Sequence, residues 1–289
     1  MALGESTNTE PIVPRVWDFW RSGPAEGLRN MAVDAALLRR ASSGATPPPG
    51  GGCGVWRCYS WSRPTVSFGR NETTLGRFDA LSVAAAGMEA VRRPTGGRAL
   101  LHAREITYSA SFPLARPVSW RAAYEAVNRL LQRALGSLGV DAAIVPYRAG
   151  NAAAPPGPLC FDRPDAGEIV VGGAKLAGSA VWRERGGYLQ HGSILLHDEQ
   201  PLLTQAASNL MATPPRAAGL AALLRVQPAV MAADHRDDDE RIRRAVEAAI
   251  EATLAAIGTV TAFGEEASLD ADIASFEREF AHPSWLWRR

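Results

Sequence analysis

Two periods of apolar positions run along the chain, and the first of them indicates helices. Over residues 26–40 apolar side chains recur every three or four positions, which predicts a helix with one buried face. Residues 119–138 form the clearest amphipathic pattern, and Gly139 follows as a plausible stop. A further helix is expected to start near the acidic run at residues 237–240, because negative charge suits a helix N-terminus. Shorter helices are expected over residues 77–86 and 201–210.

The second pattern consists of short apolar runs bounded by glycine, proline or serine, and it predicts strands. These runs cover residues 55–61, 65–70, 88–93, 99–102, 105–112, 168–171, 174–182 and 188–196. Residues 42–54 and 149–158 are rich in proline, glycine and small residues and are expected to be loops. The chain before residue 26 shows no regular pattern. Strands gathered in the middle with helices around them, without regular βαβ alternation, indicate an α+β fold.

The distribution of these elements predicts one domain over residues 15–289. Its core is expected over about residues 26–212, followed by a helical C-terminal part over about 213–289, and residues 1–14 are expected to be a flexible N-terminus. The aromatic tail at residues 276–289 is expected to pack back on the body.

Composition narrows the class of protein. The chain has 289 residues, of which 46% are hydrophobic and 21% charged, as in soluble globular proteins. No apolar run reaches the roughly 18 residues that a membrane span needs. A formal net charge of +1 gives no support for a nucleic-acid partner. The first residues lack the pattern of a signal peptide, so a cytoplasmic protein without a membrane partner is expected.

Two counts of single residue types bear on chemistry. Three cysteines at irregular spacing argue against a disulfide framework, and no ligand set for a metal is expected. Lys175 is the only lysine among 31 basic residues. A chain that uses arginine so freely keeps a lysine either by chance at the surface or because a compact primary ammonium is required. The neighbourhood of Lys175 decides between these readings.

Three segments concentrate unusual residues. In the first, Gly96 and Gly97 follow a strand, where they either form an ordinary tight hairpin or bring backbone N–H groups close to a ligand. In the second, Cys160 lies in a predicted loop upstream of Lys175, either as a small buried hydrophobe or as a reactive thiol whose pKa a nearby lysine lowers. In the third, His191 stands between two apolar runs, a context typical of a core histidine with satisfied hydrogen bonds.

Together these segments resemble the biotin/lipoate A/B protein ligase superfamily. The resemblance covers roughly residues 55–200 and rests on three motifs: Arg92-Arg93-Pro94-Thr95-Gly96-Gly97 closing on His102, Lys175-Leu176-Ala177-Gly178-Ser179-Ala180, and Gln190-His191-Gly192. It implies a mixed, largely antiparallel sheet flanked by helices, related to the catalytic domains of biotin ligases and class II synthetases.

Within the superfamily the sequence is most similar to the cysteine-dependent octanoyltransferases. Cys160 stands in a Leu-Cys-Phe context where those enzymes carry their nucleophile, whereas ATP-dependent lipoate ligases have an Asn-Asp pair there. The turn also reads Gly96-Gly97-Arg98, whereas ligases commonly have three glycines.

The resemblance implies two successive acyl transfers without a cofactor. Cys160 would take octanoate from acyl carrier protein as a thioester and pass it to a lysine of a lipoyl domain or of the glycine-cleavage H protein. Lys175 would hold the acyl carbonyl and stabilise the thiolate, and His191 would orient the site or act as a base. The family resemblance also implies that the strands at residues 99–102 and 193–196 form the walls of an apolar tunnel for the acyl chain. A monomer is the simplest expectation. The remaining substrate-binding positions are Arg92, Arg93, Thr95, Gly96, Gly97, Arg98, His102, Gly178, Ser179, Ala180 and Gly192.

Other readings stay open at this stage. An ATP-dependent lipoate–protein ligase would use Lys175 and the glycine turn to bind an acyl-adenylate, with ATP and Mg²⁺ as cofactors and Cys160 in a structural role. Amidotransfer between two lipoyl proteins would also use a cysteine. A non-catalytic acyl-binding protein could be built on the same fold.

Overall fold

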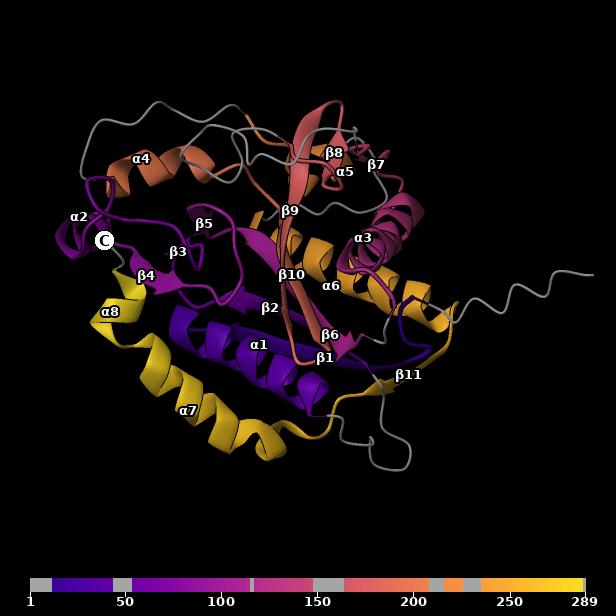
Figure 1. Ribbon diagram of the computed structural model, residues 1–289. Helices are drawn as coiled ribbons and strands as arrows, with labels where there is room; N and C mark the ends of the chain where they lie inside the picture. The colour runs from indigo at the N-terminus through magenta and orange to yellow at the C-terminus, as the bar shows by residue number, and fades with distance from the viewer. Residues whose placement is uncertain are drawn as a thin grey trace, which may run out of the picture.

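The computed structural model describes residues 12–43, 54–114, 117–147, 164–207, 216–225 and 235–287. Its centre is an eight-stranded sheet with the order β11-β1-β2-β6-β10-β9-β8-β7 (Figure 1). The strands are β1 (Val16–Ala25), β2 (Gly54–Trp61), β6 (Glu105–Pro113), β7 (Ala143–Ile144), β8 (Ile169–Val171), β9 (Ala174–Glu184), β10 (Gly187–Leu195) and β11 (Thr259–Ala262). β1 runs parallel to β2 and β11, and the other pairs are antiparallel. The predicted α+β fold with a mixed, largely antiparallel sheet is confirmed.

The expectation of an irregular chain before residue 26 is wrong for β1. Trp17 and Phe19 pack into the main core on one face of the sheet, and Trp20 packs against the opposite face. Because residues 17–20 of β1 are buried on both faces, this stretch shows no alternation of apolar and polar residues. Gly23 and Pro24 near its end added a turn signal that a strand assignment from sequence would have had to override.

A smaller sheet lies beside the large one, with the order β4-β3-β5. Its strands are β3 (Thr65–Phe68), β4 (Glu89–Arg92) and β5 (Leu100–His102). The glycine turn connects β4 to β5, but β3 lies between these two strands and pairs with both. The reading of Gly96 and Gly97 as a tight hairpin is therefore wrong, since the strands that they join do not pair with each other.

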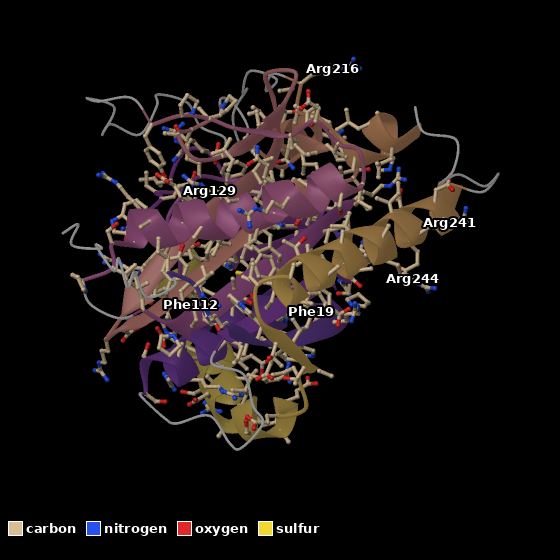
Figure 2. The ribbon with its side chains drawn as sticks, turned by 90° about the vertical axis from the view of Figure 1, so that its right-hand side faces the viewer. Phe19, Phe112, Arg129, Arg216, Arg241 and Arg244 are labelled. Atoms are coloured by element: carbon tan, nitrogen blue, oxygen red, sulfur yellow. The ribbon has the colours of Figure 1, made fainter. Side chains whose placement is uncertain are left out.

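Helices cover both faces of the large sheet (Figure 1). One face is covered by α3 (Trp120–Ser137), α5 (Leu220–Arg225) and α6 (His235–Ala255), whose apolar side chains share the main core with Trp56, Tyr108 and Phe112 of the strands. Figure 2 views this side, with the exposed Arg129, Arg241 and Arg244 on the outer surfaces of α3 and α6. The other face is covered by α1 (Gly27–Ser42) and α7 (Asp270–Phe280).

The remaining helices are short and border the small sheet. They are α2 (Ala80–Ala85), a 3₁₀ turn at Gln200–Leu202 that leads into α4 (Leu203–Ala206), and α8 (Pro283–Leu286). A second 3₁₀ turn at Glu266–Leu269 precedes α7. The aromatic tail packs back on the body, as predicted. Phe280 and Trp285 stack with ring centroids 4.9 Å apart and join the cluster that holds Met31 and Tyr59.

In the part of the chain that the structure describes, no helix combines the length and the apolar character required to traverse a lipid bilayer.

Candidate active site

The glycine turn lies at the edge of the small sheet and is packed against a neighbouring loop. Gly97 has φ of +99°, a conformation that favours glycine, and it is exposed. Gly69 follows β3 and touches this turn so closely that a Cβ on Gly69 would overlap the carbonyl oxygen of Gly97. The backbone N–H of Arg70 donates to the carbonyl oxygen of Thr95 at 2.8 Å. The glycine turn and the Gly69 loop therefore meet backbone to backbone, and this contact fixes the course of the turn.

Arg92 braces the Gly69 loop from the inside of the protein. This fully buried guanidinium donates to the carbonyl oxygens of Gly69 and Glu72 and, through Nε at 3.1 Å, to that of Leu286. The indole of Trp285 donates in turn to the carbonyl oxygen of Arg92 at 3.2 Å. Arg92, predicted to bind substrate, thus ties the loop beside the glycine turn to the C-terminal helix α8.

Arg93 braces the turn itself. Its Nη2 donates to the carbonyl oxygens of Gly96 (3.1 Å) and Arg98 (2.9 Å), and its Nη1 donates to the backbone and side chain of Ser67. Arg93 is 4% exposed. Arg92 and Arg93 therefore both hold the backbone of the site. Arg98, the third arginine of this segment, is half-buried.

His102 belongs to a buried chain that ends on Arg93. Its Nδ1 lies 2.7 Å from Glu105 Oε1, and its Nε2 lies 2.7 Å from Ser67 Oγ, which accepts from Arg93. Burial lowers the pKa of His102. Burial opposes ionisation of Glu105 as well, but the hydrogen bonds that it accepts hold its pKa below the ordinary value. The geometry describes a neutral imidazole that donates to Glu105 and accepts from Ser67.

His191 belongs to a second chain of the same form. It lies on β10, with Nδ1 2.8 Å from Asp34 Oδ2 and Nε2 2.6 Å from Thr95 Oγ1. All three side chains are buried. Burial by itself raises the pKa of Asp34, but the hydrogen bond from His191 and the charge of Arg57 outweigh it and hold that pKa below its ordinary value. The core-histidine reading of His191 describes its hydrogen bonding, and one of its partners is the glycine turn.

Two of the sequence motifs face each other across neighbouring strands. In the β9–β10 ladder Gly178, Ser179 and Ala180 pair with Ser193, Gly192 and His191. Ser179 Oγ hydrogen-bonds Tyr108 OH at 2.6 Å, and a Cβ on Gly192 would overlap the carbonyl oxygen of Gly178. Lys175 therefore lies near the start of β9, the strand that pairs with the strand of His191.

Lys175 forms a buried ion pair with Glu168. The distance from Nζ to Oε1 is 2.7 Å, and the two side chains are 2% and 6% exposed. Burial raises the pKa of Glu168, and the charge of Lys175 lowers it, with a net pKa above the ordinary value. Tyr124 and Asn128 of α3 pack around this loop, since a Cβ on Gly167 would meet the Tyr124 ring and Asn128 donates to the Gly167 carbonyl oxygen at 2.7 Å. The lone lysine is thus a core residue and not a chance surface residue.

The predicted nucleophile Cys160 lies outside the described residues. Cys58 on β2 is described, and it is a core residue that packs with Trp56 and Ile106. Burial raises the pKa of its thiol, which keeps that thiol protonated and unreactive.

The structure brings in four residues that sequence reasoning missed: Asp34, Arg57, Glu105 and Glu168. Asp34 carried a signal, because it falls three positions after Met31 on the apolar face of the predicted helix, where a carboxylate needs a buried partner. Arg57 carried a similar signal inside the apolar run of β2. Glu105 and Glu168 each stand at the beginning of a strand, where a charged residue is unremarkable.

Apolar side chains from the two predicted tunnel walls meet near the site. Leu100 of β5 and Leu195 of β10 are buried and pack together, with Ala217 against them. The predicted tunnel itself stays a prediction.

Comparison with known proteins gives the family and the fold. The profile described as the lipoyl protein ligase A/B catalytic domain matches residues 26–219. A protein of Kyrpidia tusciae named octanoyltransferase LipM is 42% identical over 189 residues, which cover 63% of this chain and 66% of that protein. The protein of the same name from Geobacillus kaustophilus is 40% identical over 200 residues, covering 66% and 69%. The matches thus span about two thirds of the length of these relatives.

Solved structures share the fold at low sequence identity. Lipoate-protein ligase A bound with ATP superposes with a TM-score of 0.69 at 19% identity, over 93% of this chain and 98% of that one. LipL1 of P. falciparum in complex with lipoate gives a TM-score of 0.65 at 13% identity, over 94% and 74%.

Proposed function

Because the chain belongs to the lipoyl protein ligase A/B catalytic domain family, we propose that it is a protein octanoyltransferase of lipoate biosynthesis. It takes an octanoyl group from acyl carrier protein and forms an amide with the acceptor lysine of a lipoyl domain or of the glycine-cleavage H protein. The observation that carries the proposal is the identity of 42% and 40% to relatives named octanoyltransferase. The family match over residues 26–219 includes the glycine turn, Lys175 and His191.

The first transfer loads the enzyme. The thiolate of Cys160 attacks the carbonyl carbon of the octanoyl thioester, the bond from that carbon to the carrier's sulfur breaks, and the carrier leaves as a thiol after taking up a proton. Negative charge develops on the carbonyl oxygen during this step. Lys175 supplies a fixed positive charge for it, since Glu168 holds the ammonium in place at 2.7 Å.

The second transfer releases the product. The neutral ε-amine of the acceptor lysine attacks the octanoyl-Cys160 thioester, an amide bond forms, the carbon–sulfur bond breaks, and the amine's proton balances the departing thiolate. The carbon–sulfur bond that breaks in each transfer belongs to a thioester. The free energy stored in the thioester drives the reaction, so no ATP is consumed. The enzyme accordingly needs no cofactor.

The glycine turn supplies the backbone side of the site. Gly96 and Gly97 offer N–H groups to the carbonyl oxygen, and the exposed position of Gly97 leaves room for the acyl head. Leu100 and Leu195 pack as a buried apolar cluster next to this turn, and we assign the octanoyl chain to that side of the site.

One experiment separates this function from its alternatives. A purified lipoyl domain is offered with octanoyl-acyl carrier protein without ATP, and in parallel with free octanoate, ATP and Mg²⁺, and the acceptor's mass is measured. An octanoyl mass increase in the first reaction is the expected result. Modification only in the second reaction would establish an ATP-dependent ligase, and no modification in either, with octanoate binding by calorimetry, would indicate an acyl-binding protein. An acceptor whose target lysine is replaced by arginine controls for nonspecific acylation.

A further inference from the structure

Asp34 on α1 is the centre of a buried polar network that reaches the glycine turn. Its carboxylate is fully buried and lies within hydrogen-bond distance of four donors from four different positions. Oδ1 accepts from Arg57 Nη1 and Ser109 Oγ, both at 2.9 Å, and Oδ2 accepts from Tyr59 OH and His191 Nδ1, both at 2.8 Å. Such a carboxylate is ionised and fixed in orientation.

The orientation of Asp34 sets the tautomer of His191. An ionised carboxylate oxygen can only accept, so the proton of the His191 ring stands on Nδ1. In the neutral ring Nε2 is then an acceptor, to which the Thr95 hydroxyl 2.6 Å away donates. An Asp–His–Thr chain resembles a catalytic triad in form, but Thr95 is fully buried and directly precedes the glycine turn, so we assign its hydroxyl to positioning and not to attack on a substrate.

The hydroxyl of Thr95 therefore serves to hold backbone. Thr95 immediately precedes Gly96, and its carbonyl oxygen is held from the other side by the N–H of Arg70. Among the described residues none accepts a hydrogen bond from the N–H of Gly96 or of Gly97. The turn thus presents backbone donors that the protein itself leaves available, and their direction depends on how Thr95 is held.

We propose that Asp34 is a positioning residue, which acts through His191 and Thr95 to aim the N–H groups of Gly96 and Gly97 at the acyl carbonyl oxygen. The inference rests on the proposed acyl transfer and adds to it the residue that keeps the turn in register. His191 is in this scheme an orienting link and not the general base. The second chain, from Glu105 through His102 and Ser67 to Arg93, holds the same turn from its other end.

Asp34→Asn tests this role. The variant keeps the shape of the side chain but offers an amide group in place of one carboxylate oxygen, so the His191 proton is expected to move to Nε2. The kcat of octanoyl transfer is expected to fall about 10- to 100-fold, because a small misplacement of the groups that hold the reacting carbonyl can cost about 100-fold, while the KM for the lipoyl domain stays close to the wild-type value. Asp18→Asn is the matched control, because Asp18 is a buried carboxylate that accepts from Thr261 at 2.6 Å on the β1–β11 edge.

Two magnetic-resonance signals report the mechanism without substrate. The ring ¹⁵N shifts of His191, one of five histidines, distinguish its tautomers, and the amide signals of Gly96 and Gly97 report the turn. Asp34→Asn is expected to change both, and Asp18→Asn neither. A wild-type kcat in Asp34→Asn, or unchanged glycine signals, would overturn the inference. An inactive wild-type enzyme with either acyl donor would instead overturn the proposed function, and the glycine signals would still decide the role of Asp34.

Thr95→Val keeps the test valid where Asp34→Asn does not fold. It removes only the hydroxyl at the far end of the chain, so His191 is expected to keep its Nδ1 proton while kcat falls to a similar extent. Where Asp34→Asn does fold, the two losses are expected to overlap in the double variant, because both substitutions break one path. Fully additive losses would show that Asp34 and Thr95 act separately and would contradict the proposal.

Discussion

Glu168 and Lys175 face each other as an ion pair in the core, with 2.7 Å between Oε1 and Nζ. Glu168 precedes β8, and Lys175 lies near the start of β9, so a tight turn between neighbouring strands brings the two charges together. Each charge offsets the cost of removing the other from water, and it does so only while both are present. The pair therefore fixes an ammonium at one point in the core.

Removing one partner of this pair should be more costly than removing both. Lys175→Met is expected to lower the free energy of unfolding by about 3 kcal/mol, because it leaves a buried carboxylate without a counter-charge. The double variant with Glu168→Leu is expected to regain most of this loss. Urea denaturation measures both. A double variant as unstable as Lys175→Met would refute the account, and octanoyl transfer should be lost in both variants.

Cys160 and Cys58 are expected to differ sharply in reactivity. Cys160→Ala is expected to abolish transfer and to eliminate the hydroxylamine-sensitive octanoyl adduct on the enzyme, which mass spectrometry of the intact protein detects. Cys58→Ala is the matched control and is expected to retain both, because the Cys58 thiol is buried in the core and its pKa is raised. Persistence of the adduct in Cys160→Ala would place the covalent step elsewhere.

Acid should weaken the protein through Asp34. Its pKa in the folded protein lies below the ordinary value of about 4. The unfolded chain therefore binds more protons between these two values, so stability is fully present above about pH 5 and falls with decreasing pH. Glu168 acts in the opposite sense, because its folded pKa is raised and the folded state binds more protons above the ordinary value.

The measurement compares unfolding free energies from pH 3 to pH 7. Asp34→Asn is expected to be less stable than the wild type by a constant amount above about pH 5, with the difference shrinking below about pH 4. For Glu168→Gln the difference in unfolding free energy from the wild type is expected to change above about pH 5 instead. A difference for Asp34→Asn that is the same at every pH would contradict the lowered pKa.

A residue outside the family match should affect the site. Trp285→Ala removes the hydrogen bond to the Arg92 carbonyl oxygen and the stacking partner of Phe280, and is expected to reduce kcat at least tenfold with a smaller loss for Trp285→Phe. Asp272→Asn in the same C-terminal part removes a surface ion pair with Arg39 and is expected to leave kcat unchanged. Equal activity of the Trp285 and Asp272 variants would show that α8 does not support the turn.

Much of the fold could be predicted from local patterns, because the longer helices have one apolar face and many strands are bounded by glycine, proline or serine. The predicted helix at residues 26–40 corresponds to α1, and the helix at 119–138 to α3. β1 escaped prediction because residues 17–20 are buried on both faces, so alternation disappears there. The hairpin reading failed for a different reason: whether two strands pair depends on β3, which enters from an earlier part of the chain.

The candidate site divides in the same way. Lys175 and the glycine turn stood out from composition and motif, since each is rare or conformationally special at its position. Asp34 and Glu168 did not, because a carboxylate acquires its meaning only from the residue that it meets in space. His191 lies 157 positions from Asp34, and no spacing in the sequence announces that contact.

The hydrogen bonds that join Arg92 to Trp285 and Leu286 also bear on the order in which the protein folds during its synthesis. During translation Arg92 leaves the ribosome long before Trp285 and Leu286, with the whole large sheet except β1 and β2 made in between. Until those two residues arrive, the loop beside the glycine turn lacks part of its support. The nascent chain can therefore assemble most of its core before the support of the glycine turn is complete.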